Sequence, residues 1–167
     1  MEVKLLQPDD AAGYWKLRLE ALKNHPTAFG TSYEEALQRV NPIQQIAERF
    51  ANTGEYTFGA FVEGELIGVV TLMQEKAKKF CHRATILAMY VTPEKRGRGV
   101  AKALLQAAIK RAQEVESIIK INLTVVSENV SAKALYQNLG FQVFGTEEKA
   151  LYYNNVYYDE EHMVLFL

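Results

Sequence analysis

The sequence predicts an α/β fold in which a mixed central sheet of about seven strands carries helices on both faces. The first observation is the order of the expected elements, which runs strand, three helices, three strands, helix, strand, helix and two strands. The second is that two strand–helix–strand connections occur in this order, which favours a mixed sheet. The third is that no repeat, low-complexity tract or linker interrupts the chain, so we expect residues 1–167 to form one domain.

One strand and three helices are expected in the first part of the chain. Apolar residues recur at helical spacing until Pro26, which ends the first helix. Ser32 and Glu35 have the spacing of a capping box, and Asn41-Pro42 resembles a helix start with proline at the first position. The expected elements are a strand at 2–6 and helices over 14–22, from 32 and from 42 to about 52.

The rest of the chain predicts three strands, a long helix, a strand, a short helix and two final strands. Glu63-Gly64 is a turn signal, Gly140 is placed to end the short helix, and Asn154-Asn155 predicts a tight hairpin. The expected strands are 56–62, 66–72, 84–91, 118–126, 141–153 and 156–167, and the helices are 101–115 and 131–138.

Composition and charge exclude several classes of protein. The 19 basic and 20 acidic residues argue against a general nucleic-acid binder. Cys81 is the only cysteine, which excludes an internal disulfide and a cysteine-rich zinc site. The histidines, His25, His82 and His162, lack ligand spacing, so we expect no metal. No signal peptide and no apolar run of ~20 residues is present, so we expect a cytoplasmic protein that binds no membrane.

The segment 91–101 is the most informative part of the sequence. A buried strand leads into a loop with Gly97 and Gly99, and the loop runs directly into a helix. Backbone N–H groups of such a loop, with the helix dipole, suit a phosphate or pyrophosphate group. Neither a Walker loop nor a dinucleotide fingerprint matches, since Lys102 stands where the latter needs its third glycine. A basic, solvated turn is the alternative interpretation.

Two spaced motifs resemble the GCN5-related N-acetyltransferase (GNAT) superfamily. The first is Arg-x-x-Gly-x-Ala at residues 96–101, which is similar to the family's coenzyme-A loop. The second is Asn-x-x-Ala-x-x-x-Tyr-x-x-x-Gly-Phe at residues 129–141, one helix and one strand later. The element order resembles the family fold over nearly the whole chain, and residues 157–163 resemble a subset of small bacterial members.

The resemblance implies a site for acetyl-CoA as co-substrate. It places the pyrophosphate on backbone amides of Arg96, Gly97, Arg98, Gly99, Val100 and Ala101. It also implies that backbone groups of Met89 and Val91 pair with the pantetheine arm, with an amide near Met89 against the thioester oxygen. We expect the side chains of these two residues to be ordinary core. Asn129 would bond towards the coenzyme arm, and it could equally be the cap of the helix that follows.

Tyr136 is the residue that the resemblance assigns to catalysis, as the acid that protonates the leaving sulfur. A phenol suits this task because it is neutral at pH 7 and presents one directed proton. The alternative is that Tyr136 is only packed, because it lies on an apolar helix face.

The general base and the acceptor are less well defined. Thr85 and Thr124 occupy positions where family members often carry glutamate, and threonine cannot act as a base at neutral pH. We therefore expect a water chain, or a carboxylate such as Glu34, Glu35, Glu128 or Asp159, to accept the proton of the amine. Glu34, Glu35 and Asp159 are also expected to contact the acceptor at the rim of its pocket. These acids could instead be a helix start and a solvated edge strand.

The predicted function is acetyl transfer from acetyl-CoA to a primary amine, most simply of a small molecule, by direct attack on the thioester. A non-catalytic acyl-CoA sensor of the same fold, or an enzyme acting on protein or peptide amino groups, is the alternative. The sequence leaves a homodimer open.

Overall fold

The computed structural model describes residues 1–167 and contains one seven-stranded sheet in the order β1-β2-β3-β4-β5-β7-β6. The β4–β5 pair is parallel and every other neighbouring pair is antiparallel, so the predicted mixed sheet is confirmed. The strands are β1 Glu2–Leu5, β2 Glu55–Val62, β3 Glu65–Gln74, β4 Arg83–Val91, β5 Lys120–Val126, β6 Gln142–Tyr153 and β7 Val156–Phe166.

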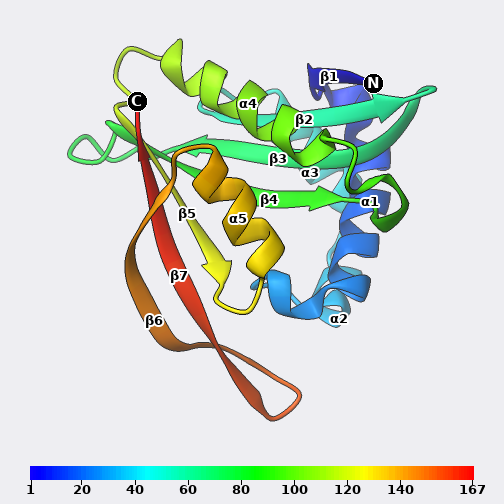
Figure 1. The fold of residues 1–167 in the computed structure, drawn as a ribbon. Coiled ribbons are helices and arrows are strands. Elements are labelled where there is room, and N and C mark those ends of the chain that lie inside the picture. Colours follow the sequence, from blue (N-terminus) through cyan, green and yellow to red (C-terminus); the bar gives the residue numbers. More distant parts are fainter.

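Helices cover both faces of this sheet, with α4 and α5 on one side and α1 to α3 on the other (Figure 1). One apolar core joins α4 and α5 to residues such as Ile121, and a second joins α1 and α3 to Val69 and Tyr90. The helices are α1 Ala11–Asn24, α2 Tyr33–Leu37, α3 Pro42–Phe50, α4 Val100–Gln113 and α5 Val130–Asn138, with short 3₁₀ turns at Pro8–Asp10, Pro26–Ala28 and Pro93–Lys95. None of these helices is both long enough and apolar enough to cross a membrane.

Local signals position the ends of the helices as the sequence predicts, with one difference. Ser32 Oγ accepts from the N–H of Glu35 at 3.1 Å, and the Glu35 carboxylate accepts from the N–H of Ser32 at 2.8 Å, which completes the capping box. Pro42 begins α3, but the Asn41 side chain caps nothing because its backbone is left-handed, with φ of 49°. Asn154 and Asn155 also have positive φ, as a tight hairpin turn requires.

The central strands β4 and β5 separate along their length, which opens the middle of the sheet. They pair only where residues 83–85 meet residues 120–122. Beyond that point β4 contains a bulge, where Ala88 has φ of 53° and the register against β3 shifts. A bulge bends its strand and increases the local twist. The second half of β4 is therefore paired with β3 but not with β5.

Candidate functional site

A cavity of about 870 Å³ occupies the opening between β4 and β5 and receives residues from both faces of the sheet. Its walls include residues 86–91 of β4 and 123–126 of β5. Helix α5 contributes Ala132, Leu135 and Tyr136, whereas α1 and α3 on the opposite face contribute Tyr14 and Arg49. The cavity thus lets two reactants approach each other from opposite faces of the sheet.

The loop before α4 presents a run of unused backbone donors. The N–H groups from Gly97 to Lys102 donate to no protein acceptor. Gly97 and Gly99 have φ of 72° and 78°, and a Cβ at either position would meet no protein atom within 4 Å. The loop therefore lies open to a ligand, and the positive end of α4 favours an anion there. These features fit the pyrophosphate of acetyl-CoA.

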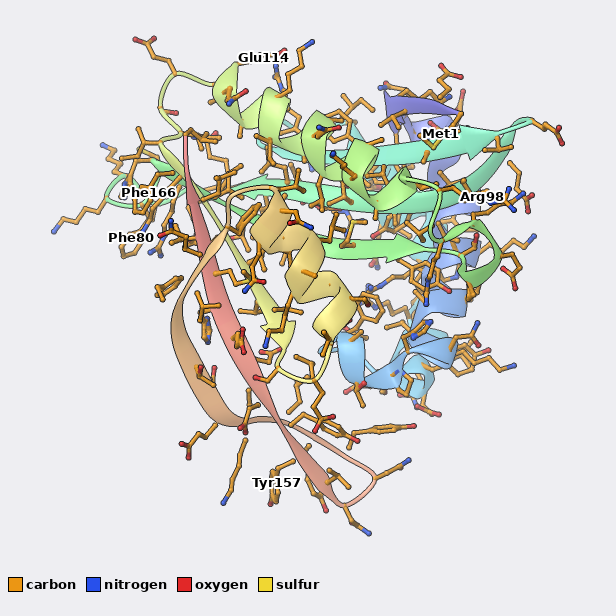
Figure 2. All side chains as sticks on the ribbon, viewed as in Figure 1. Met1, Phe80, Arg98, Glu114, Tyr157 and Phe166 are labelled. Atoms are coloured by element: carbon orange, nitrogen blue, oxygen red, sulfur yellow. The ribbon has the colours of Figure 1, made fainter.

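The Arg96 side chain is exposed, but two of its nitrogens contact the protein and hold this loop in place. Its N–H already donates to Pro93 O, so the run of free amides starts one residue later than expected. Its Nε donates to Val91 O at 2.9 Å, and its Nη2 lies 2.8 Å from His25 Nε2. Burial, together with the charge of Arg96, lowers the pKa of His25, so the neutral imidazole can accept that hydrogen bond. Arg98 also lies exposed on the loop (Figure 2).

The free edge of β4 supplies the second group of backbone donors. The N–H of Thr92 donates to Ile67 O of β3 at 2.9 Å. Because N–H directions alternate along a strand, the N–H groups of Met89 and Val91 point to the other edge, into the opening. Val91 is buried in the core and Met89 packs against it, as expected for their side chains. This edge fits an extended arm such as pantetheine, which would pair as an added strand does.

Tyr136 lies in the cavity wall and is held there by the end of α5. The N–H groups of Gly140 and Phe141 donate to Gln137 O and Tyr136 O, which forms a Schellman motif. The Phe141 ring packs edge-on against Tyr136 with centroids 6.0 Å apart. The Tyr136 hydroxyl makes no hydrogen bond with the protein, and burial raises its pKa to about 12. The residue is therefore packed through its ring and still offers a neutral hydroxyl.

Asn129 caps α5 and also lines the cavity. Its Oδ1 accepts from the N–H of Ala132 and from Ser131 Oγ, both at 3.2 Å. The side-chain NH₂ has no protein partner, so it is free to donate to a ligand. Both functions expected of Asn129 are compatible.

Three acids expected at the acceptor pocket, Glu34, Glu35 and Asp159, are not among the residues that line the cavity. Glu35 is held by the capping box, and those hydrogen bonds to Ser32 lower its pKa. Glu34 is an exposed neighbour at the helix start. Asp159 Oδ1 accepts from the N–H of Lys149 at 2.7 Å, on the part of the hairpin that carries Tyr157 away from the helices (Figure 2). The positions of Glu34 and Glu35 are explained by the start of α2, and that of Asp159 by a solvated strand.

The cavity contains Glu128, one of the carboxylates expected as a base, together with charged residues that the motifs do not indicate. Glu160 of β7 lines it, and burial is the main cause that raises the pKa of this carboxyl. Glu128 and Thr124 also line it, whereas Thr85 does not. Arginines from α1 and α3 form part of the opposite wall. Of these arginines, Arg18 has the clearest signal in the sequence. It follows Tyr14 by four residues and therefore lies on the same buried face of α1.

Known proteins with similar sequence or structure point to one family. The profile of the Acetyltransferase (GNAT) family matches residues 19–141. The L-amino acid N-acetyltransferase AaaT of Escherichia coli K12 is 29% identical over 133 residues, which cover 78% of this chain and 82% of that protein. The spermidine N(1)-acetyltransferase of the same organism is 25% identical over 146 residues, covering 87% of this chain and 77% of that protein.

A solved structure shows the fold directly. The yncA structure of Salmonella typhimurium, determined with its cofactor acetyl-CoA, superposes with a TM-score of 0.86 at 19% identity and covers 100% of this chain and 94% of that chain. The sheet and its helices are thus a GNAT fold.

Proposed function

The chain belongs to the GNAT family of acetyl-CoA-dependent acetyltransferases, and we propose that it moves the acetyl group to a primary amine of a small molecule. The observation that carries this proposal is that one cavity receives residues from both faces of the sheet. We call the segment with free N–H groups at residues 97–102 the anion loop. The cavity joins its Ala101 end, the free edge of β4 and Tyr136 on one side to residues of α1 and α3 on the other. The similarity to enzymes named for L-amino acids and spermidine supports a small acceptor.

The reaction we propose is direct attack of the amine nitrogen on the thioester carbon. The N–C bond forms, the C–S bond breaks, and coenzyme A leaves as its thiolate, which takes up a proton from solvent. The amides from Gly97 to Lys102 would bind the pyrophosphate, and the N–H of Met89 would donate to the thioester oxygen as negative charge develops there. The Tyr136 hydroxyl would donate to the leaving sulfur. Each role uses a donor that has no protein acceptor.

The proton of the attacking amine also needs an acceptor, since an alkyl ammonium has a pKa of about 10. We propose that it passes through water to Glu160. This carboxylate lines the cavity, and its raised pKa makes it a stronger base than an ordinary glutamate. Thr124 cannot accept this proton at neutral pH. Glu160 is not among the carboxylates that the sequence suggests for this role.

The test is a panel of amines incubated with acetyl-CoA, in which the release of free thiol and the N-acetyl product are both measured. Small-molecule acetylation predicts turnover with at least one low-molecular-weight amine, and strong loss in Tyr136→Phe. Turnover only with peptide amino termini would move the acceptor to proteins. Tight binding of acetyl-CoA without turnover of any amine or peptide would support the sensor alternative and overturn the proposal.

A further inference from the structure

Three arginines gather on the wall of the cavity that faces away from the anion loop. Arg18 comes from α1, Arg39 follows α2 and Arg49 comes from α3. The positive charges of Arg39 and Arg49 add to burial in lowering the pKa of the Arg18 guanidinium. The three groups are therefore close enough to repel one another, which is an arrangement that costs free energy unless an anion joins them.

The protein itself supplies little compensation for these charges. Glu55 is the one acid in a salt bridge with them, through Arg49 Nε at 3.0 Å. Arg49 Nε and Nη2 are nevertheless buried without an aligned hydrogen-bond acceptor. Arg18 stacks over the Phe29 ring at 4.4 Å and forms no salt bridge. Stacking covers the face of a guanidinium and leaves its N–H edge free, which suits bidentate recognition of an anion.

Acetyl-CoA does not account for this cluster. Its phosphates fit the free amides before α4, and α4 lies on the opposite face of the sheet from α1 and α3 (Figure 1). An anion that pairs with these three arginines would therefore belong to the second reactant, the acceptor. The neighbouring wall is aromatic, with Tyr14, Trp15 and Phe29, which suits an apolar side chain.

We propose that the acceptor is an amine that also carries a carboxylate, as an α-amino acid with an apolar side chain does, and that Arg18 and Arg49 bind this carboxylate. The inference rests on the proposed acetyl transfer and names its substrate class. A polyamine would bring its distal ammonium groups against the same guanidinium groups. The arginines thus favour an amino-acid acceptor over a polycation.

The experiment compares acceptors that share one skeleton and differ in charge. L-phenylalanine, L-phenylalaninamide and phenethylamine are tested with spermidine, and phosphoethanolamine separates a carboxylate site from a phosphate site. A charge-assisted hydrogen bond predicts kcat/KM about 10- to 150-fold higher for L-phenylalanine than for its two neutral analogues. Arg18→Gln should remove most of this preference by raising KM for the amino acid, and Arg18→Lys should restore part of it.

Arg111→Gln is the matched control, since it removes one positive charge from α4, where Arg111 contacts Glu114 outside the cavity. Thermal melting and acetyl-CoA binding show that each variant is folded. Equal use of L-phenylalanine and phenethylamine, unaltered by Arg18→Gln, would overturn the carboxylate site and leave acetyl transfer intact. Preference for phosphoethanolamine would overturn the carboxylate as the anion. Absence of turnover with every amine would overturn the proposed function as well.

Discussion

Replacing Tyr136 by phenylalanine removes one hydroxyl and nothing else from the cavity wall. That hydroxyl has no hydrogen-bond partner in the protein, while the ring is fixed by Phe141 and the Schellman motif. The Tyr136→Phe variant should therefore keep its free energy of unfolding to within about 0.5 kcal/mol. Any effect on turnover then belongs to the reaction rather than to folding.

The size of that effect follows from the pKa of Tyr136. Burial raises this pKa to about 12, so the hydroxyl remains protonated throughout the neutral range. A thiol has a pKa of about 8.5, so its thiolate is a weaker base than the Tyr136 phenolate. Complete proton transfer from Tyr136 to the leaving thiolate would therefore be uphill. The hydroxyl should act mainly as a hydrogen-bond donor to developing negative charge, which contributes about 1.5–3 kcal/mol. We expect kcat to fall about 10- to 150-fold.

The assay is steady-state turnover with acetyl-CoA varied, together with urea denaturation of the same preparations. Tyr90→Phe is the contrast, because the Tyr90 hydroxyl donates to Glu20 at 2.9 Å and its loss should cost stability by about 1–2 kcal/mol. An unchanged kcat in Tyr136→Phe would refute the reasoning and leave the residue as packing only. A large loss of acetyl-CoA affinity with normal kcat would place the hydroxyl in binding instead.

Three further predictions test the anion loop, the base and the helix cap. Gly99→Glu should abolish acetyl-CoA binding in calorimetry because its carboxylate would stand beside the phosphates, whereas Gly64→Glu, with the similar φ of 81°, should bind normally. Glu160→Gln should lower kcat/KM. Because burial raises the pKa of the Glu160 carboxyl, this variant should also lose the rise of kcat/KM with pH that follows deprotonation of Glu160, whereas Glu34→Gln should keep the wild-type pH profile. Asn129→Ala loses the bond from the N–H of Ala132, so urea denaturation should show a loss of about 1 kcal/mol; an unaltered stability would contradict its role as the cap.

The order and type of the elements could be predicted because they depend on local signals. Proline at the start of α3, the capping box of α2 and the glycine after α5 act through their own backbones and near neighbours. The anion loop belongs to the same class, since Gly97 and Gly99 supply both its conformation and its exposure. Local physics of this kind is visible in the sequence alone.

The acceptor wall could not be predicted, because it depends on contacts between distant segments. Arg18 and Glu160 line the same cavity only because β4 and β5 separate. The bulge at Ala88 is not indicated by the residue type at that position. Alanine rarely adopts positive φ, so no propensity indicates a bulge at that position. Glu35 is a different case, because the Glu35 carboxylate accepts a hydrogen bond from the N–H of Ser32 within the local capping box, and that local contact is enough to account for it.

The most direct measurement follows free thiol and N-acetyl product together during incubation with acetyl-CoA and L-phenylalanine. Direct transfer to the amine predicts equal amounts of the two products at every time point, with both rates reduced together in Tyr136→Phe. Thiol released without N-acetyl product, at the same rate with and without the amino acid, would mean hydrolysis of the thioester and would contradict the account.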